Sequence, residues 1–189
     1  MPGKDMDYES LRRFCFTGVR GVGKSTIINR ISSKVPQVNF VSGSGILQEM
    51  MGKDYESFEY LPEEEKCSLR IKLNKLLQET QRIVSKDLVV DSHLTVYNLK
   101  TGVIDTIFTE QDIKFYTDII LLDSSLEKIY DHRSGDTVKK RIIDRDIIAR
   151  ELETERQEAQ RMADEHGIRL HVIEMGDDSA EKIINILES

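Results

Sequence analysis

The stretch "FCFTGVRGVGKSTIINR", residues 14–30, decides the fold, because it joins an apolar run to a helical pattern through a loop with three glycines. Residues 18–25, "GVRGVGKS", satisfy the pattern G-x-x-x-x-G-K-[ST] at every fixed position. The glycines allow backbone amides to converge, and the start of the helix directs its positive end at the same point. The stretch therefore predicts a strand, a phosphate-binding loop and a helix in direct succession.

The chemistry of this loop predicts a nucleoside triphosphate, ATP, as its ligand. We expect Lys24 to place its ammonium between the β- and γ-phosphate oxygens and Ser25 to offer its hydroxyl to Mg²⁺. The helix that starts near Thr26 adds its N-terminal amides. The predicted ATP-binding residues are Gly18, Gly21, Val22, Gly23, Lys24, Ser25 and Thr26.

The rest of the chain repeats the alternation of strand and helix. Nearly continuous apolar runs, typical of strands covered on both faces of a parallel sheet, occur at 14–17, 38–41, 88–91, 119–123 and 170–174. Helical patterns separate them at 24–34, 44–52, 62–86, 125–132, 146–166 and 179–188. We expect a single α/β domain over residues 1–189, in a three-layer fold with a five-stranded parallel sheet and helices on both faces.

Composition narrows the possible partners. The chain has 189 residues, of which 39% are hydrophobic and 32% charged, with a net charge of −7. No apolar run is long enough to cross a bilayer, and the polar N-terminus lacks the apolar region of a signal peptide, so we expect a cytoplasmic protein that does not bind membranes. The acidic balance makes nucleic acid an improbable partner. The two cysteines, Cys15 and Cys67, fit neither a zinc site nor a disulfide.

Two aspartates compete for the role of positioning the magnesium ion. Asp91 ends the run "LVVD" and opens the polar segment "DSHLT", whereas Asp123 ends "IILLD". A carboxylate at the end of a neighbouring strand can hold Mg²⁺ through water. We favour Asp91 and expect Asp123 to cap the helix beginning near Ser125, although the reverse assignment stays open. His93 lies two residues beyond Asp91, close enough to take part.

Three stretches together resemble one known family. "FTGVRGVGKST", then "VDSHLT", then "DRD" followed by "ETERQEAQR" are similar to the archaeal-type adenylate kinases and to adenylate-kinase-like P-loop proteins, over Phe14 to Glu188. The resemblance implies transfer of a phosphoryl group from ATP to a nucleoside monophosphate. It also implies a monophosphate-binding helical segment at about 42–86 and a small lid at about 133–150. Residues that match family positions outside the phosphate loop are Arg70, Asp91, His93, Arg133, Arg145, Gln157 and Arg161.

The sequence departs from that pattern in three places. Where bacterial and eukaryotic adenylate kinases carry an arginine after the second strand, "VSGSGILQE" offers Gln48. Their "GFPR"-like motif is replaced by "DSHL", and the lid is a few residues longer than in the archaeal enzymes. We therefore expect a nucleoside monophosphate, most simply AMP, as the acceptor, and this expectation depends on the residues that would bind it.

Cations and hydroxyls suit such a reaction. We expect Arg133, Arg141 and Arg145 to close over the transferred phosphoryl group, with Arg141 and Arg145 one helical turn apart and facing one anion. Lys139 and Lys140 lie in the same stretch. The second strand ends in "FVSGSG", without a carboxylate to serve as base, which favours a phosphate acceptor, with Ser42 and Ser44 as candidate ligands.

Two other functions remain open. The first is a kinase for a small hydroxyl compound, with Asp91 as the base. The second is an ATPase that acts as a regulatory or assembly factor through slow hydrolysis, kept open by Gln48 in the place of the arginine. The sequence predicts neither the identity of the monophosphate nor an oligomeric state.

Overall fold

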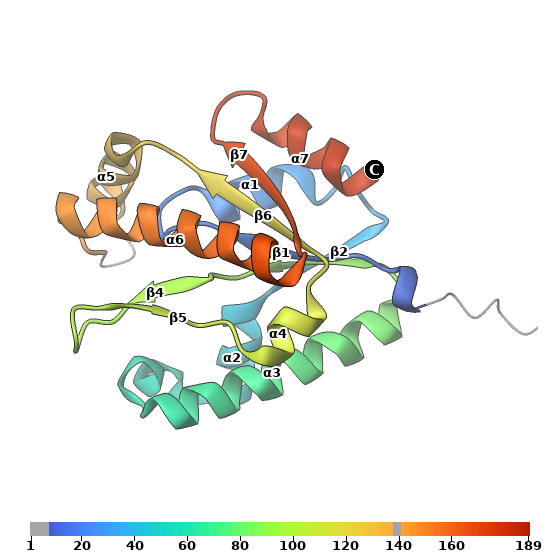
Figure 1. Ribbon diagram of the computed structural model, residues 1–189, viewed down its shortest axis with the longest axis horizontal. Helices are drawn as coiled ribbons and strands as arrows, with labels where there is room; N and C mark the ends of the chain where they lie inside the picture. Colours follow the sequence, from blue (N-terminus) through green and yellow to red (C-terminus); the bar gives the residue numbers. More distant parts are fainter. Residues whose placement is uncertain (1–7, 138–140) are drawn as a thin grey trace, which may run out of the picture.

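The computed structural model describes residues 8–137 and 141–189, and its centre is a parallel sheet in the order β2-β3-β1-β6-β7 (Figure 1). The five strands are β1 (Arg13–Thr17), β2 (Val38–Ser42), β3 (Asp87–Asp91), β6 (Asp118–Asp123) and β7 (Arg169–Glu174). Each predicted strand is confirmed to within one residue. Because β1 lies between β3 and β6, the loop that follows β1 has the carboxyl ends of both neighbours beside it.

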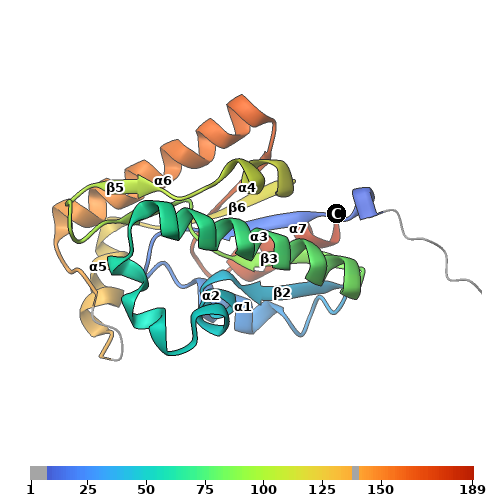
Figure 2. The ribbon, with the colours of Figure 1, turned by 90° about the horizontal axis from the view of Figure 1, so that it is seen from below.

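Helices cover both faces of the sheet, as predicted. They are α1 (Lys24–Ile31), α2 (Gly43–Met51), α3 (Glu63–Val84), α4 (Glu110–Phe115), α5 (Leu126–Gly135), α6 (Arg145–His166) and α7 (Ser179–Glu188). One apolar core contains Phe14 and Phe16 of β1 together with α1 and α7, which lie side by side in Figure 1. The other apolar core contains Cys15 together with α3, α4 and the second half of α6. In Figure 2 this face of the sheet, covered by α3, is turned toward the reader. Alternate residues of β1 thus point to opposite faces.

Several short elements escaped the sequence analysis. The strands β4 (Thr95–Tyr97) and β5 (Ile104–Thr106) form an antiparallel hairpin that packs against α6. Two 3-10 helices, η1 (Tyr8–Ser10) and η2 (Gly52–Tyr60), and the helix α4 complete the chain. Apart from η2, these segments have only three to six residues, too few to show a hydrophobic period.

The helix boundaries follow local chemistry. Gly167 adopts a left-handed φ of 68° at the end of α6, as a glycine at this position commonly does. Thr109 and Asp112 form a capping box, which starts α4. The first helix is shorter than predicted and ends at Ile31, since the chain turns over 32–34 ahead of Pro36.

Within the described residues, the predicted lid region, 133–150, comprises the end of α5, the residues 136–137 and 141–144, which belong to no helix or strand, and the first residues of α6. Lys139 and Lys140 lie outside the described residues. Within the described parts of the chain, no helix has both the length and the apolar character needed to span a membrane.

Candidate active site

The loop between β1 and α1 has the conformation that its glycines permit. Gly18 has a φ of 144°, and a Cβ atom there would lie 2.6 Å from the carbonyl oxygen of Leu122, so a side chain cannot be accommodated. Gly23, directly before α1, has a φ of 104° in the left-handed region. These two positions let the chain leave β1 sharply and enter α1 within a few residues.

The first turn of α1 presents amides without a side-chain cap. Gly23 precedes the helix, and no side chain of the described residues hydrogen-bonds the amides there as a cap. The first N–H groups of a helix have no partner within the helix, and they carry its positive dipole end. Ser25 and Thr26 are exposed at this turn. The arrangement is suited to binding phosphate oxygens.

Lys24 lies at the centre of the site and is 8% exposed. Its ammonium donates to the carbonyl oxygen of Gly18 at 2.5 Å and lies 3.4 Å from Nδ1 of His93. Burial lowers the pKa of Lys24 from 10.5 to about 8, while the carboxylates of Asp91 and Glu155 act in the opposite direction. The ammonium is therefore charged at neutral pH but poorly solvated, and an incoming phosphate would improve its environment.

Asp91 ends β3 beside the phosphate loop. It pairs in register with Phe16 of β1 on one side and with Ser42 of β2 on the other. His93 follows, with Nδ1 3.1 Å from the carbonyl oxygen of Gly18. Burial, followed by the charges of Lys24 and Arg20, lowers the pKa of His93 well below its ordinary value, so its ring is neutral at pH 7.

Asp123 has a different environment. Its two carboxylate oxygens accept hydrogen bonds from Arg156 at 2.9 and 2.8 Å, and one also accepts from the amide of Ser124. The helix α5 is capped instead by Ser125, whose side chain accepts from the amide of Lys128. The expectation that Asp123 caps this helix is therefore wrong, because the serine two residues later is placed to do so.

Ser25 and Asp91 have the chemistry required for the predicted magnesium ion. Mg²⁺ prefers oxygen ligands and usually keeps several waters, with one or two protein groups and substrate phosphates completing its shell. A hydroxyl at the first turn of α1 and a carboxylate at the end of the adjoining strand match that donor set. Their roles as metal ligands remain predictions.

Arg133 is buried against the phosphate loop, with its side chain 2% exposed. It donates from Nε to the carbonyl oxygen of Arg20 at 2.8 Å and forms an ion pair of 2.7 Å with Glu151 of α6. A Cβ atom on Gly21 would lie 3.1 Å from its Cγ. Arg133 thus supports the loop, and its role in closing over a phosphoryl group stays a prediction.

Arg141 and Arg145 do not face one anion, contrary to the prediction. Arg141 lies in the irregular segment before α6 and forms an ion pair of 2.7 Å with Asp136. Arg145 is the first residue of α6, where it pairs with Glu127 and stacks over the ring of Tyr130 at 4.1 Å. Because the helix begins only at Arg145, the two arginines are not one helical turn apart. Arg141 still contributes to lowering the pKa of His93, so its charge acts within the site.

Of the predicted acceptor residues, Ser42 ends β2, Ser44 lies on α2 and Arg70 lies on α3. Ser42 caps α2 by accepting from the amide of Gly45 at 3.1 Å, and its hydroxyl is 3.2 Å from that of Ser44. Arg70 forms an ion pair of 2.5 Å with Glu63, whose side chain is 58% exposed. Ser42 thus has a structural task, and Arg70 is held by a partner at the surface.

Four residues near the site were not predicted from the sequence. Glu151 and Glu155 are buried on α6, His132 places Nδ1 3.0 Å from the carbonyl oxygen of Gly21, and Arg20 reaches Glu59 of η2 at 3.4 Å. The two glutamates had a detectable signal. Glu155 falls in the stripe formed with Ile148, Leu152, Ala159 and Met162, whose helical spacing marks the buried side of α6.

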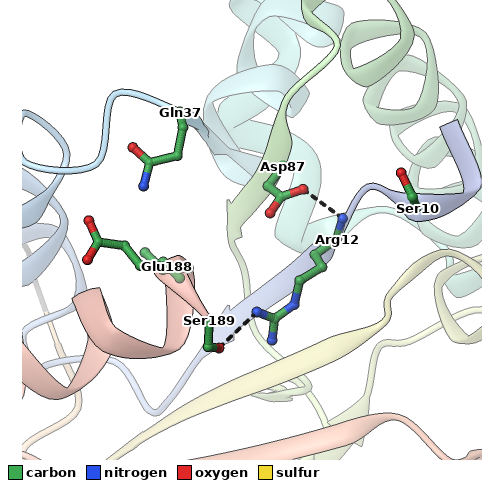
Figure 3. A pocket seen from close by; sticks show the side chains of 7 residues that line it. Ser10, Arg12, Gln37, Asp87, Glu188 and Ser189 are labelled. Atoms are coloured by element: carbon green, nitrogen blue, oxygen red, sulfur yellow. Dashed lines mark hydrogen bonds between the residues drawn. The ribbon is translucent and has the colours of Figure 1, made fainter. Parts of the chain in front are cut away.

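A hollow of about 520 Å³ lies at the opposite end of the sheet (Figure 3). Arg12 and Asp87, which line it, stand at the start of β1 and β3, and the Arg12 amide donates to Asp87 at 2.8 Å. The Arg12 guanidinium donates to Ser189 at 3.3 Å and to Asp118 at 2.7 Å. The hollow is therefore remote from the phosphate loop.

Asp118, beneath that hollow, is fully buried at the start of β6. Burial acts to raise its pKa, but hydrogen bonds from Arg12, His171 and Thr117 outweigh it and hold the pKa below its ordinary value. Arg169 adds an ion pair of 2.9 Å. The cluster joins β1, β6 and β7.

Comparisons with known proteins agree with this geometry. A family model described as an AAA domain (AAA_17) matches residues 17–149. No curated protein matches the chain. A shikimate kinase from Bacteroides thetaiotaomicron superposes with a TM-score of 0.58 at 15% identity, covering 94% of this chain and 99% of that one. A sugar kinase from Janibacter sp. HTCC2649 gives 0.61 at 13% identity, covering 94% and 93%.

A third structure, shikimate kinase from Acinetobacter baumannii in complex with shikimate, gives a TM-score of 0.58 at 14% identity and covers 96% of this chain and 95% of that one. At these identities the likeness establishes the fold. The family match includes the phosphate loop, both candidate aspartates and the first residues of α6. The chain therefore belongs to the family of AAA domains that this model describes, and it has the fold of the P-loop kinases.

Proposed function

We propose that this protein is a MgATP-dependent phosphotransferase. The observation that carries the proposal is the state of the loop around Lys24: glycines at positive φ, an uncapped first turn of α1, and a buried ammonium whose hydrogen-bond partners are a carbonyl and a neutral imidazole. Such a site has a cation and amides ready for an anion. Phosphoryl transfer depends chiefly on placing charges of this kind.

In the proposed reaction Lys24 leaves the carbonyl oxygen of Gly18 and bonds oxygens of the β- and γ-phosphates. Ser25 and Asp91 would hold Mg²⁺, which would neutralise charge on the phosphates. Arg141 is paired with Asp136, with the two side chains 19% and 22% exposed, and we expect it to exchange this carboxylate for the transferred phosphoryl group, which offers oxygen acceptors of the same charge. Arg133 would hold the loop through its hydrogen bond to the carbonyl oxygen of Arg20.

We propose a nucleoside monophosphate, of which AMP is the simplest case, as the acceptor. The end of β2 presents Ser42 and Ser44 but no carboxylate that would serve as a base. Arg70 is held by a single surface glutamate, so an acceptor phosphate can take its place at little expense. A phosphate nucleophile needs no base, only cations, and Arg70 supplies one.

A hydroxyl compound is the second candidate acceptor. Residues 49–65, which run from α2 to the start of α3, contain seven acidic residues and one lysine, and this charge disfavours an anionic acceptor. Asp91, beside the phosphate loop, would then act as base. The solved structures of this fold named above include shikimate kinases and a sugar kinase, which supports the same alternative.

The test measures ADP release from MgATP with each monophosphate in turn, with a panel of sugars and hydroxy acids, and with no acceptor. Acceleration by one monophosphate is the expected result, and Lys24→Ala is the inactive control. Arg70→Ala should raise the KM for that monophosphate by at least about tenfold and leave the KM for ATP unchanged. Arg82→Ala, on the same helix, is the matched control. Equal rates in all wells would reject phosphotransfer and favour the ATPase factor.

A further inference from the structure

The buried carboxylate of Glu155 gathers an unusual set of donors. Glu155 lies in the middle of α6 and is 2% exposed. One carboxylate oxygen accepts from the hydroxyl of Thr17 and, at 3.2 Å, from the amide of Leu94. The other accepts from the amide of Thr95 at 2.9 Å and from its hydroxyl. All four donors belong to residues beside the candidate active site.

These donors come from the two segments that must cooperate in the proposed reaction. Thr17 is the last residue of β1 and directly precedes Gly18 of the phosphate loop. Leu94 and Thr95 directly follow His93, and Asp91 begins the same segment. The amide of Leu94 also lies 3.2 Å from the hydroxyl of Thr17, so the carboxylate closes a small network between the segments.

Chemistry explains why a carboxylate occupies this position. A buried charge is tolerated only when it is well hydrogen-bonded, and Glu155 receives two backbone amides and two hydroxyls. Glutamine has nearly the same shape, but one of its two acceptor positions becomes an NH₂ donor that would face other donors. The position therefore requires acceptors on both atoms.

The segment that carries Asp91 is fixed to β1 on both sides of His93. The amide of Ser92 donates to the carbonyl oxygen of Phe16 at 3.0 Å, and Leu94 and Thr95 bond to Glu155. His93, held between these anchors, reaches the carbonyl oxygen of Gly18. Without Glu155 the described contacts that remain are those of the Ser92 amide with Phe16, of His93 with Gly18 and of the Leu94 amide with the Thr17 hydroxyl, and the Thr95 amide and hydroxyl lose their acceptor.

We propose that Glu155 is a positioning residue that sets the distance between the phosphate loop and the segment from Asp91 to Thr95. The inference rests on the proposed function, because the distance matters only if both segments act on one MgATP. It assigns to the middle of α6 a part in the reaction, although Glu155 itself touches neither nucleotide nor acceptor.

The experiment compares Glu155→Gln with Glu158→Gln. Glu158 lies on the same helix and is also buried, but its partner is Arg161, away from the site. For Glu155→Gln we expect kcat to fall by about 10- to 100-fold, since a displacement of reacting groups by about 1 Å has effects of that order. The KM for ATP should stay within about threefold, because the amides of the phosphate loop remain. Glu158→Gln should leave both constants within about twofold.

Amide hydrogen exchange provides a readout that does not depend on turnover. In Glu155→Gln the amides of Leu94 and Thr95 should exchange at least about tenfold faster, while amides in the centre of β6 keep their protection. Unchanged exchange at Leu94 and Thr95, or equal kinetic losses in Glu155→Gln and Glu158→Gln, would overturn the proposal.

A milder pair of variants covers the case in which Glu155→Gln does not fold. Thr95→Val removes one hydroxyl donor and should lower kcat about threefold or more, and Thr95→Ser, which keeps the hydroxyl, should restore it. Equal kcat in the Val and Ser variants would contradict the proposal. If the wild-type protein turns over no acceptor, the proposed function fails, and the exchange at Leu94 and Thr95 still decides whether Glu155 holds this segment.

Discussion

Lys24→Met should make the nucleotide-free protein more stable while abolishing the binding of ATP. The reason is that the ammonium of Lys24 is buried at 8% exposure and is held by the carbonyl oxygen of Gly18 and the neutral ring of His93. Methionine has a similar length and volume but no charge. The substitution thus removes the free-energy cost of burying a charge, and it also removes the group that would bind the phosphates.

The size of the effect follows from the pKa of Lys24. Burial lowers it from 10.5 to about 8, and this net value already includes the attraction of Asp91 and Glu155. One pKa unit corresponds to about 1.36 kcal/mol, so the charged form disfavours folding by about 3 kcal/mol at pH 7. Loss of the hydrogen bond to Gly18 removes about 1 kcal/mol or somewhat more. The free energy of unfolding of Lys24→Met should therefore exceed that of the wild type by about 1–2 kcal/mol.

The same pKa predicts a pH dependence with a definite sign. Between about pH 8 and pH 10.5 the folded protein has lost the proton of Lys24 while the unfolded chain still holds it. Stability rises with pH wherever the unfolded state binds more protons. Across this window the free energy of unfolding of the wild type should rise by about 3 kcal/mol relative to that of Lys24→Met. Above the window the two proteins should differ only by the contacts that the uncharged Lys24 and the methionine make.

Urea unfolding at pH 7, with and without MgATP, measures the prediction. MgATP at 100 times its Kd should stabilise the wild type by about 2.7 kcal/mol and leave Lys24→Met unchanged, so that the order of stability reverses. Lys75→Met, at an exposed position of α3, is the matched control and should behave as wild type. A nucleotide-free Lys24→Met less stable than wild type, with the same pH slope, would refute the reasoning.

Three further outcomes follow from the contacts described above. Asp91→Asn should lower kcat by about 100-fold and raise the Mg²⁺ concentration required, whereas Asp123→Asn, which only weakens the pair with Arg156, should stay within about threefold; kinetics over a Mg²⁺ series separate the two. Asp118→Asn should reduce the free energy of unfolding at pH 7 by about 3–5 kcal/mol. In the wild type the same contribution should be lost as the pH falls through the lowered pKa of Asp118, and urea unfolding from pH 7 to 2 measures this loss. Arg145→Ala should change stability by less than about 1 kcal/mol, because its pair with Glu127 is exposed, so a large fall in kcat would identify a role in the lid.

The sheet was predictable because its strands are covered on both faces. Runs such as "LVVD" and "IILLD" are apolar at nearly every position, and short β-branched runs of this kind between helical patterns are typical of buried parallel strands. The loop "GVRGVGKS" was predictable for another reason: each fixed residue answers a steric or chemical requirement, as the 2.6 Å distance at Gly18 illustrates. The hairpin of β4 and β5 lacked either signal.

The pairing of charged side chains was the part that sequence spacing could not supply. Arg156 lies three residues after Glu153 on its own helix, yet it bonds to Asp123 at the end of β6. Arg150 lies four residues after Asp146, yet it donates to the carbonyl oxygen of Gly102 in the hairpin. An ion pair between residues three or four positions apart on a helix contributes only a few tenths of a kcal/mol. A well-placed partner on another element is therefore preferred.

The buried glutamates of α6 connect the lid region to the nucleotide site. Glu151 holds Arg133, which packs on the phosphate loop, and Glu155, one turn later, holds the end of β1 and the start of β4. Both therefore lie on the side of α6 that faces the loop, while Arg145 stands at the exposed start of the same helix. Arg145 and Glu155 are about three turns apart on one helix, so a rigid shift of α6 at Arg145 would also displace Glu151 and Glu155. If the proposed lid closes, it would then either bend the chain before Arg145 or move the phosphate loop and the Asp91 segment together. We expect the first, because the described residues 141–144 belong to no helix or strand that would have to break.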